Sequence, residues 1–211
     1  MSTNHAQAER AALCDLFLEV GPDAPTLCGE WTTRDLAAHL VIRERRPDAA
    51  VGIVLPFGQG HSEKVRLRTA DQPWDQLVEL VRSGPPTLSP MRIGAVDKAV
   101  NTNEFFIHHE DVRRAQDGWT PRLIDVDLDT ELWGVLRTFT KLGLRKAPSG
   151  VVLDTGDGRR FTAKDASPLV EVRGPVSELV MFTSGRQAHA KVEVLGPDDA
   201  VEQLRTAKLG V

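Results

Sequence analysis

The sequence has no uninterrupted apolar stretch that approaches the ~20 residues needed for a membrane-spanning helix. Its first residues are polar and lack the apolar segment that a secretory signal peptide carries. These two absences argue against a membrane partner. We therefore expect a protein of the cytoplasm.

Cysteine is scarce, since only Cys14 and Cys28 occur in 211 residues. They form neither a Cys-x-x-Cys pair nor a paired metal-binding spacing, so we expect two reduced thiols in a reducing compartment. Cys14 is flanked by leucines in a helical pattern, which assigns it to the core. Nothing near Cys28 in the sequence visibly lowers its pKa, so we assign this thiol a structural role as well.

An excess of positive charge is also missing. Lysine and arginine number 26 against 30 acidic residues, which gives a net charge of −4 and a pI near 5.9. This balance argues against a nucleic-acid-binding surface. Short basic groups such as Arg43, Arg45 and Arg46 are typical of solvated helix ends. With 41% hydrophobic and 27% charged residues, the composition is that of a globular protein with one domain or two small ones.

Apolar residues at three- and four-residue spacing predict helices in the first two thirds of the chain. The expected helices cover residues 3–18, 33–46, 73–82, 104–116 and 127–145. Residues 48–69 and 87–99 lack this periodicity, so we expect less regular structure there.

From residue 150 the pattern changes to short β-type runs separated by turn residues. Strands are expected at 151–153, 160–162, 169–173 and 191–195, with helices at 175–183 and 197–207. The first two strands are joined by a hairpin connection at residues 154–158. The sequence thus predicts an α+β protein with a helical domain of residues 1–147 and a small α+β domain of residues 148–211.

Residues 101–116 place metal-ligand side chains at helical spacing. Glu104, His108 and Asp111 lie at i, i+4 and i+7 and therefore stack on one face of a helix. One of the residues 101–103 is expected to cap its start. A carboxylate and an imidazole on adjacent turns suit Zn²⁺ or another divalent metal, but two ligands do not hold an ion.

His39 is the best candidate for a third ligand. It lies beside Leu36 and Leu40, which mark a buried helix face, and the helix begins with a capping box formed by Thr32 and Asp35. The spacing also allows a simpler interpretation, in which His39 is a hydrogen-bonded core residue and Glu104 and His108 form a surface pair. Spacing alone leaves both open.

The sequence resembles the mycothiol-dependent maleylpyruvate isomerase family in three runs, CGEWTTRDLAAH at 28–39, EFFIHHED at 104–111 and VRGPVSELVMFTSGR at 172–186. This family is a branch of the DinB/YfiT-like metal-binding helix bundles of actinobacteria. The resemblance implies a DinB-like up-and-down helix bundle as the N-terminal domain. It also implies that His39, Glu104 and His108 bind the metal.

The resemblance further implies mycothiol as the thiol cosubstrate and a small electrophile as the substrate of an S-transferase or isomerase. Arg186 matches the Gly-Arg of the family and is expected to bind a carboxylate of thiol or substrate. Asp111 and Asp35 are candidate acceptors for the imidazoles of His108 and His39. His109 points about 100° away from His108 and is expected to pair with another helix.

Residues 48–99 match no motif of the isomerase itself, so the substrate stays open. Two alternatives remain beside thiol chemistry. In one, the metal only braces a binding or regulatory module. In the other, the protein is a thiol-independent metal hydrolase with Asp111 or another nearby carboxylate as the base. The sequence also leaves open whether the chain forms a homodimer.

Overall fold

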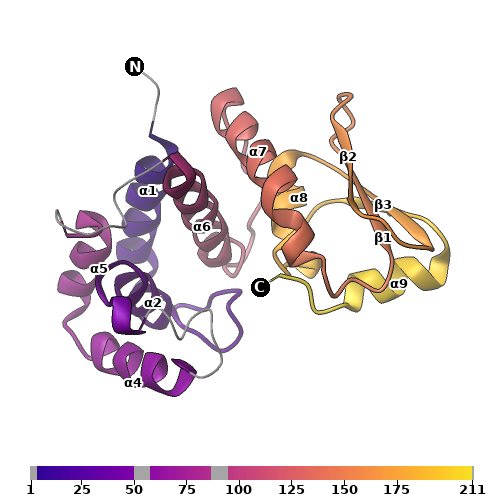
Figure 1. Ribbon diagram of the computed structural model, residues 1–211. Coiled ribbons are helices and arrows are strands. Elements are labelled where there is room, and N and C mark those ends of the chain that lie inside the picture. The colour runs from indigo at the N-terminus through magenta and orange to yellow at the C-terminus, as the bar shows by residue number, and fades with distance from the viewer. Residues whose placement is uncertain (1–3, 50–57, 87–94, 211) are drawn as a thin grey trace. The chain divides into compact units, whose positions relative to one another are not determined.

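Figure 1 shows the computed structural model of the chain, which describes residues 4–49, 58–86 and 95–210, with only the backbone for residues 95–100. The chain divides into two compact units, Met1–Trp119 and Thr120–Val211. In its described part the chain is helix-rich with one small four-stranded sheet. This is the α+β class that the sequence predicts.

The first unit is helical in its described part. Its helices are α1 (His5–Val20), α2 (Thr33–Arg45), α4 (Gln59–Ala70), α5 (Trp74–Ser83) and α6 (Ala95–Arg113). The first helix packs against the last, α6, and also against α5, while α2 packs on α4 and α5. This pairing of α1 with α6 brings residues from both ends of the unit together.

One apolar cluster joins α1, α2, α5 and α6, and a smaller one joins α2 to α4. Leu13 and Phe17 of α1, Leu36 and Leu40 of α2, and Phe105 of α6 are fully buried in the larger cluster. The i, i+4 spacing of the leucines on α2 directs both of them into the cluster, as the sequence predicts. Full burial of one such side chain contributes roughly 1.5–3 kcal/mol to the free energy of unfolding. The cluster therefore fixes the position of α2 against α6.

The start of α2 is fixed by the expected capping box. The backbone N–H of Thr32 donates to Asp35 Oδ2 over 3.0 Å, and the Thr32 hydroxyl donates to the same oxygen over 3.1 Å. These bonds satisfy polar groups that a helix start leaves without an intrahelical partner. They fix the residue at which α2 begins, about two turns before His39.

Two helical segments differ from the prediction. Helix α4 occupies much of 48–69, because its buried face is formed largely by small or polar side chains that leave no apolar periodicity. Helix α6 begins at Ala95, so residues 101–103 lie inside the helix and do not cap it. Residues 50–57 and 87–94, to which these predictions also apply, lie outside the described residues.

The second unit contains the sheet. It begins with α7 (Val126–Gly143) and continues through β1 (Gly150–Asp154), β2 (Arg160–Lys164), β3 (Leu169–Arg173), α8 (Val176–Thr183), the short 3₁₀ helix η3 (Gln187–His189), β4 (Glu193–Leu195) and α9 (Asp198–Thr206). The strand order is β2-β1-β3-β4. The strands and helices predicted after residue 150 are all present, with ends shifted by a few residues.

Strand β1, one of the two internal strands, is buried along its whole length. It pairs antiparallel with β2 through a hairpin and parallel with β3, and β3 pairs antiparallel with β4. Helix α7 packs on α8 and on β2. The compact unit therefore includes α7, whereas the predicted domain of residues 148–211 does not. The domain boundary near residue 148 remains a prediction.

No helix in the part of the chain that the structure describes is both long and apolar enough to cross a membrane.

Candidate metal centre

Helices α2 and α6 bring His39, Glu104 and His108 together. His39 Nε2 lies 3.6 Å from Glu104 Oε1, and His108 Nε2 lies 3.3 Å from the same oxygen. The three ligand-type atoms are all within 4.8 Å of one another. Two imidazole nitrogens thus converge on one carboxylate oxygen, in a site that is largely buried.

These positions fit a divalent metal ion. Tetrahedral zinc with bonds near 2.1 Å holds its nitrogen and oxygen ligands about 3.4 Å apart. The measured separations of 3.6 and 3.3 Å bracket this value. Nitrogen and carboxylate oxygen are also donors that zinc prefers. Three such ligands leave room for a fourth, which is the arrangement typical of catalytic zinc.

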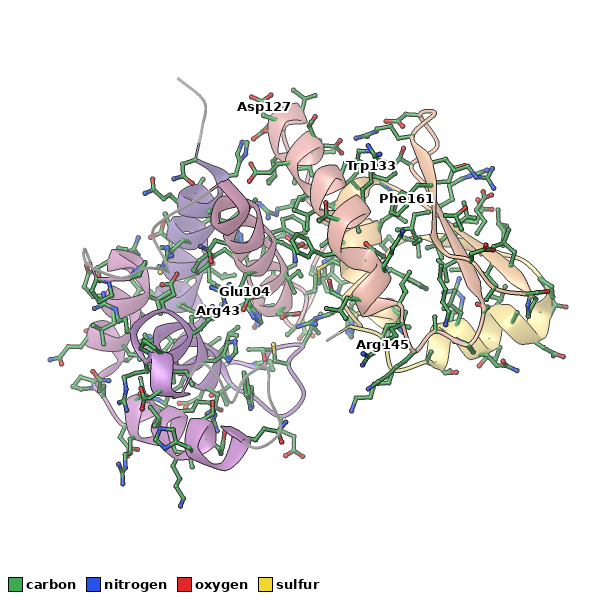
Figure 2. The ribbon with its side chains drawn as sticks, in the orientation of Figure 1. Arg43, Glu104, Asp127, Trp133, Arg145 and Phe161 are labelled. Atoms are coloured by element: carbon green, nitrogen blue, oxygen red, sulfur yellow. The ribbon has the colours of Figure 1, made fainter. Side chains whose placement is uncertain are left out.

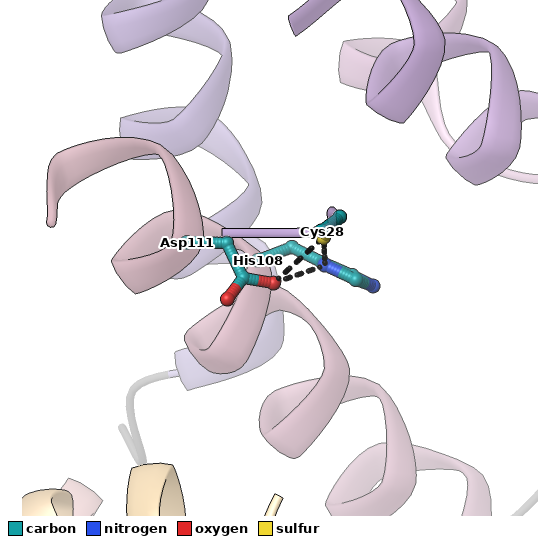
Figure 3. Close-up of side chains that lie close together, drawn as sticks. All are labelled: Cys28, His108 and Asp111. Atoms are coloured by element: carbon teal, nitrogen blue, oxygen red, sulfur yellow. Dashed lines mark hydrogen bonds and ion pairs between the residues drawn. The ribbon is translucent and has the colours of Figure 1, made fainter. Parts of the chain in front are cut away.

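The second nitrogen of His108 is held by Asp111. His108 Nδ1 lies 2.9 Å from Asp111 Oδ2, one turn further along α6 (Figure 3). Asp111 is fully buried, so this contact is shielded from water. The carboxylate therefore stands where the sequence expects an acceptor that orients the imidazole.

Cys28 lies against the same pair. Its Sγ is 3.1 Å from Asp111 Oδ2 and 3.8 Å from His108 Nδ1 (Figure 3). The sequence assigns this thiol a purely structural role and misses the contact. The available signal was its place at the start of the run that ends in His39. Sequence spacing gives no direct measure of how the loop folds back onto α6.

Two further predictions have opposite outcomes. His109 Nδ1 lies 2.9 Å from Glu9 Oε2 on α1, so this residue pairs with another helix, as expected. Asp35 accepts hydrogen bonds from Thr32 and from Arg66, so the prediction that it orients His39 is wrong. The capping position of Asp35 turns its carboxylate toward the start of α2.

Arg43 is part of the site, although the sequence assigned it to a solvated helix end. Its Nε lies 3.3 Å from Glu104 Oε1, and both residues are labelled in Figure 2. Its Nη1 donates to Asn101 Oδ1 over 2.8 Å. Only 14% of the side chain is exposed. Arg43 follows His39 by one helical turn, so i, i+4 spacing carried a signal that it shares the face of His39.

The charges in the site are tightly coupled. Burial alone would raise the pKa of Glu104, but hydrogen bonds with His108 and His39 and the charge of Arg43 hold it well below its usual range. Burial also favours neutral imidazoles and lowers the pKa of His39. Burial also acts to lower the pKa of His108, but hydrogen bonds with Asp111, Cys28 and Glu104 outweigh it and raise this pKa well above its ordinary value.

Aromatic and cationic side chains flank His39. The ring of Trp31 lies 5.3 Å from the imidazole of His39, measured between centroids, and the guanidinium of Arg66 lies 5.1 Å from the ring of Trp31. The imidazole of His108 approaches His39 edge-on at 5.5 Å. These contacts restrict rotation of the two histidine rings.

Arg186 lies in the second unit, just beyond α8. Its side chain donates to the backbone oxygen of Ser184 over 2.5 Å. Its expected role in binding a carboxylate remains a prediction.

No protein-family model matches the sequence, and no curated protein matches it. Solved structures do match. A crystal structure of the mycothiol-dependent maleylpyruvate isomerase superposes with a TM-score of 0.61 at 15% identity, covering 92% of this chain and 95% of that one. A variant of the same enzyme with a histidine-to-alanine substitution gives 0.60 at 16% identity, with the same coverage. At this identity the likeness is one of fold.

Proposed function

We propose that this chain binds one zinc ion through His39, Glu104 and His108 and uses it to activate mycothiol toward a small electrophile. The observation that carries the proposal is the convergence of two imidazole Nε2 atoms on one oxygen of Glu104. The fold-level likeness to a mycothiol-dependent isomerase supports the choice of thiol. It also supports a DinB-like bundle for the N-terminal domain.

A bound zinc ion with an open position lowers the pKa of a thiol, so that the thiolate is available at neutral pH. A thiolate that adds to the substrate and later leaves gives an isomerase, whereas one that stays bonded gives an S-transferase. Both begin with the same nucleophilic addition. The proposed function therefore includes both the isomerase and the S-transferase reaction.

The side chains around the ligands have distinct tasks in this proposal. Asp111 holds the ring of His108 so that Nε2 faces the ion. Arg43 lies against Glu104 and fixes the orientation of its carboxylate. Trp31 packs against the ring of His39 and limits its rotation. Arg186 is proposed to bind a carboxylate of thiol or substrate.

Two side chains close in sequence to the ligand motifs, His109 and Cys28, make contacts away from Nε2 of His108. His109 is engaged with Glu9, and Cys28 lies against the opposite nitrogen of the His108 ring. A fourth position left to an exogenous thiol favours catalysis over a metal that only braces the fold.

The test compares zinc content and mycothiol binding in the wild type, His39→Ala and Glu104→Ala. We expect about one zinc ion per chain in the wild type and its loss in both variants, with thiol binding lost in parallel. His61→Ala is the matched control, because this histidine is exposed and pairs with Asp48 away from the ligands. Circular dichroism checks that each variant is folded.

A metal-free wild type after gentle purification, or variants that retain zinc, would refute the site. Zinc loss in the variants without any mycothiol binding by the wild type would keep the metal centre and refute the thiol.

A further inference from the structure

We propose that Cys28, His108 and Asp111 form a second metal site, which takes a thiophilic divalent cation such as Cd²⁺. A neutral imidazole binds one ion at a time, so this site and the ligand set described above are alternatives for His108. The site lies at Nδ1 of His108, whereas the ligand set described above uses Nε2 of the same ring. One imidazole thus stands between two sets of donors. The proposal goes beyond the thiol chemistry and does not depend on it.

The three donor atoms already converge. Cys28 Sγ, His108 Nδ1 and Asp111 Oδ2 lie within 4.8 Å of one another, with separations of 2.9, 3.1 and 3.8 Å. Tetrahedral zinc holds a sulfur and a nitrogen or oxygen ligand about 3.6 Å apart. An ion can therefore enter after the two shorter contacts, which are hydrogen bonds, open by roughly half an ångström.

The position of Cys28 is fixed by its own loop. The backbone N–H of Leu27 donates to the Asp111 carbonyl oxygen over 3.1 Å, which ties the loop to α6. The N–H of Cys28 donates to the hydroxyl of Thr26 over 3.1 Å, and its carbonyl accepts from Trp31. The thiol is thus held over the His108–Asp111 pair by backbone bonds that do not involve its sulfur.

The chemistry of the donors selects the kind of ion. A thiolate together with an imidazole favours soft cations such as Cd²⁺ over Mg²⁺ or Ca²⁺, which prefer oxygen ligands. Asp111 contributes a carboxylate that is fully buried, so it is already removed from bulk water. Binding forms metal bonds to Sγ and Nδ1, and the protons that these atoms carry pass to water.

An ion can reach this site from the thiol side. Cys28 is partly exposed, in contrast to Cys14, which is completely buried in the core of the first unit. The two cysteines therefore provide a matched pair for experiment. Within the described residues, Cys28 belongs to a group of side chains that could hold a metal ion, whereas Cys14 belongs to none.

The experiment titrates metal-free protein with Cd²⁺ and follows the ultraviolet charge-transfer absorption that a thiolate–cadmium bond produces. We expect this absorption to grow to saturation in the wild type and in Cys14→Ala, and to vanish in Cys28→Ala. It should persist in a His39→Ala/Glu104→Ala double variant, because that variant keeps all three donors of the second site. Circular dichroism confirms the fold of each protein.

No absorption in the wild type, or absorption that survives in Cys28→Ala, would overturn the second site. Loss of the signal in the double variant would also overturn it, because Cys28 would then be a ligand of the first metal. Cys28→Ala should keep its zinc, because Cys28 is not a ligand of the first site, and this result separates the two proposals. If the first site fails in the test above, the absorption still reports on the second alone.

Discussion

His108 and Asp111 lie one turn apart on α6, with Nδ1 2.9 Å from Oδ2, and this contact fixes which nitrogen of the imidazole faces Glu104. A histidine side chain that rotates freely loses conformational entropy when it binds an ion. A buried carboxylate that holds the ring removes most of that loss. The geometry of this pair therefore bears directly on the affinity of the first metal site.

Replacing Asp111 should weaken zinc binding without removing a ligand. We expect Asp111→Asn to reduce zinc affinity by roughly 10- to 100-fold, because the amide can still accept a hydrogen bond but carries no charge. Competition with a chelating dye measures the affinity. Asp127→Asn, on the exposed start of α7, is the control and should leave it unchanged. Equal zinc affinity in both variants would rule out this role of Asp111.

Zinc affinity should rise with pH. In the metal-free protein, hydrogen bonds with Asp111, Cys28 and Glu104 outweigh burial and raise the pKa of His108 well above its ordinary value. A protonated imidazole cannot bind the ion, so affinity is lost as pH falls through that raised pKa. Below it, we expect roughly a tenfold fall per pH unit. Isothermal titration at several values between about pH 6 and 8 measures the slope, and a flat profile would contradict the prediction.

Arg186 should affect thiol or substrate binding and leave zinc in place. If its guanidinium binds a carboxylate, Arg186→Ala should weaken binding by roughly 10- to 100-fold. Arg186→Lys keeps the charge but loses the bidentate geometry, so it should recover only part of this loss. Arg205→Ala, exposed on α9, is the control. Unchanged binding in Arg186→Ala would remove this residue from the site.

Asp35 should matter for stability, since it caps α2 and bonds to Arg66. Asp35→Asn is expected to lower the free energy of unfolding by roughly 1 kcal/mol, as measured by urea denaturation. Zinc content should stay at the wild-type level, because the carboxylate does not contact His39. Loss of zinc in a folded Asp35→Asn protein would restore the role that the sequence suggested.

The same carboxylate gives a stability effect with a defined sign. Burial acts to raise the pKa of Asp35, but hydrogen bonds from Thr32 and Arg66 lower it below its ordinary value. Its contribution is therefore complete above the unfolded-state pKa of about 3.9 and is lost as pH falls through the folded-state pKa. Below about pH 4, the stabilities of wild type and Asp35→Asn should converge.

The sequence predicts most helices and strands because their buried faces are apolar and periodic. Helix α5 and the strands after residue 150 are examples. Helix α4 is not predicted, because serine, arginine and threonine occupy much of its buried face. The start of α6 at Ala95 is not predicted for a similar reason, since residues 95–103 are mostly polar or small and show no apolar stripe.

Some residues of the candidate site could be predicted from the sequence, and others could not. His39, Glu104 and His108 could be proposed as a set because helical spacing and a family resemblance point to them. Cys28 could not be placed, because its position depends on how the loop at 26–31 packs onto α6. Spacing puts Arg43 on the face of His39, but its contact with Glu104 depends on how α2 packs against α6. A hydrogen bond between backbone atoms, such as that from Leu27 to Asp111, leaves no mark in the sequence.

The pairing of α1 with α6 also has a consequence for folding. In the sequence, α1 is the first and α6 the last of the described helices of this unit. Their contact therefore closes a long loop, and the loss of chain entropy on forming it is large. During synthesis α6 leaves the ribosome last of the helices in this unit, and it carries two of the three proposed zinc ligands. A nascent chain that ends before Glu104 therefore contains His39 but no partner for it, and zinc binding would mark the moment at which the first unit is complete.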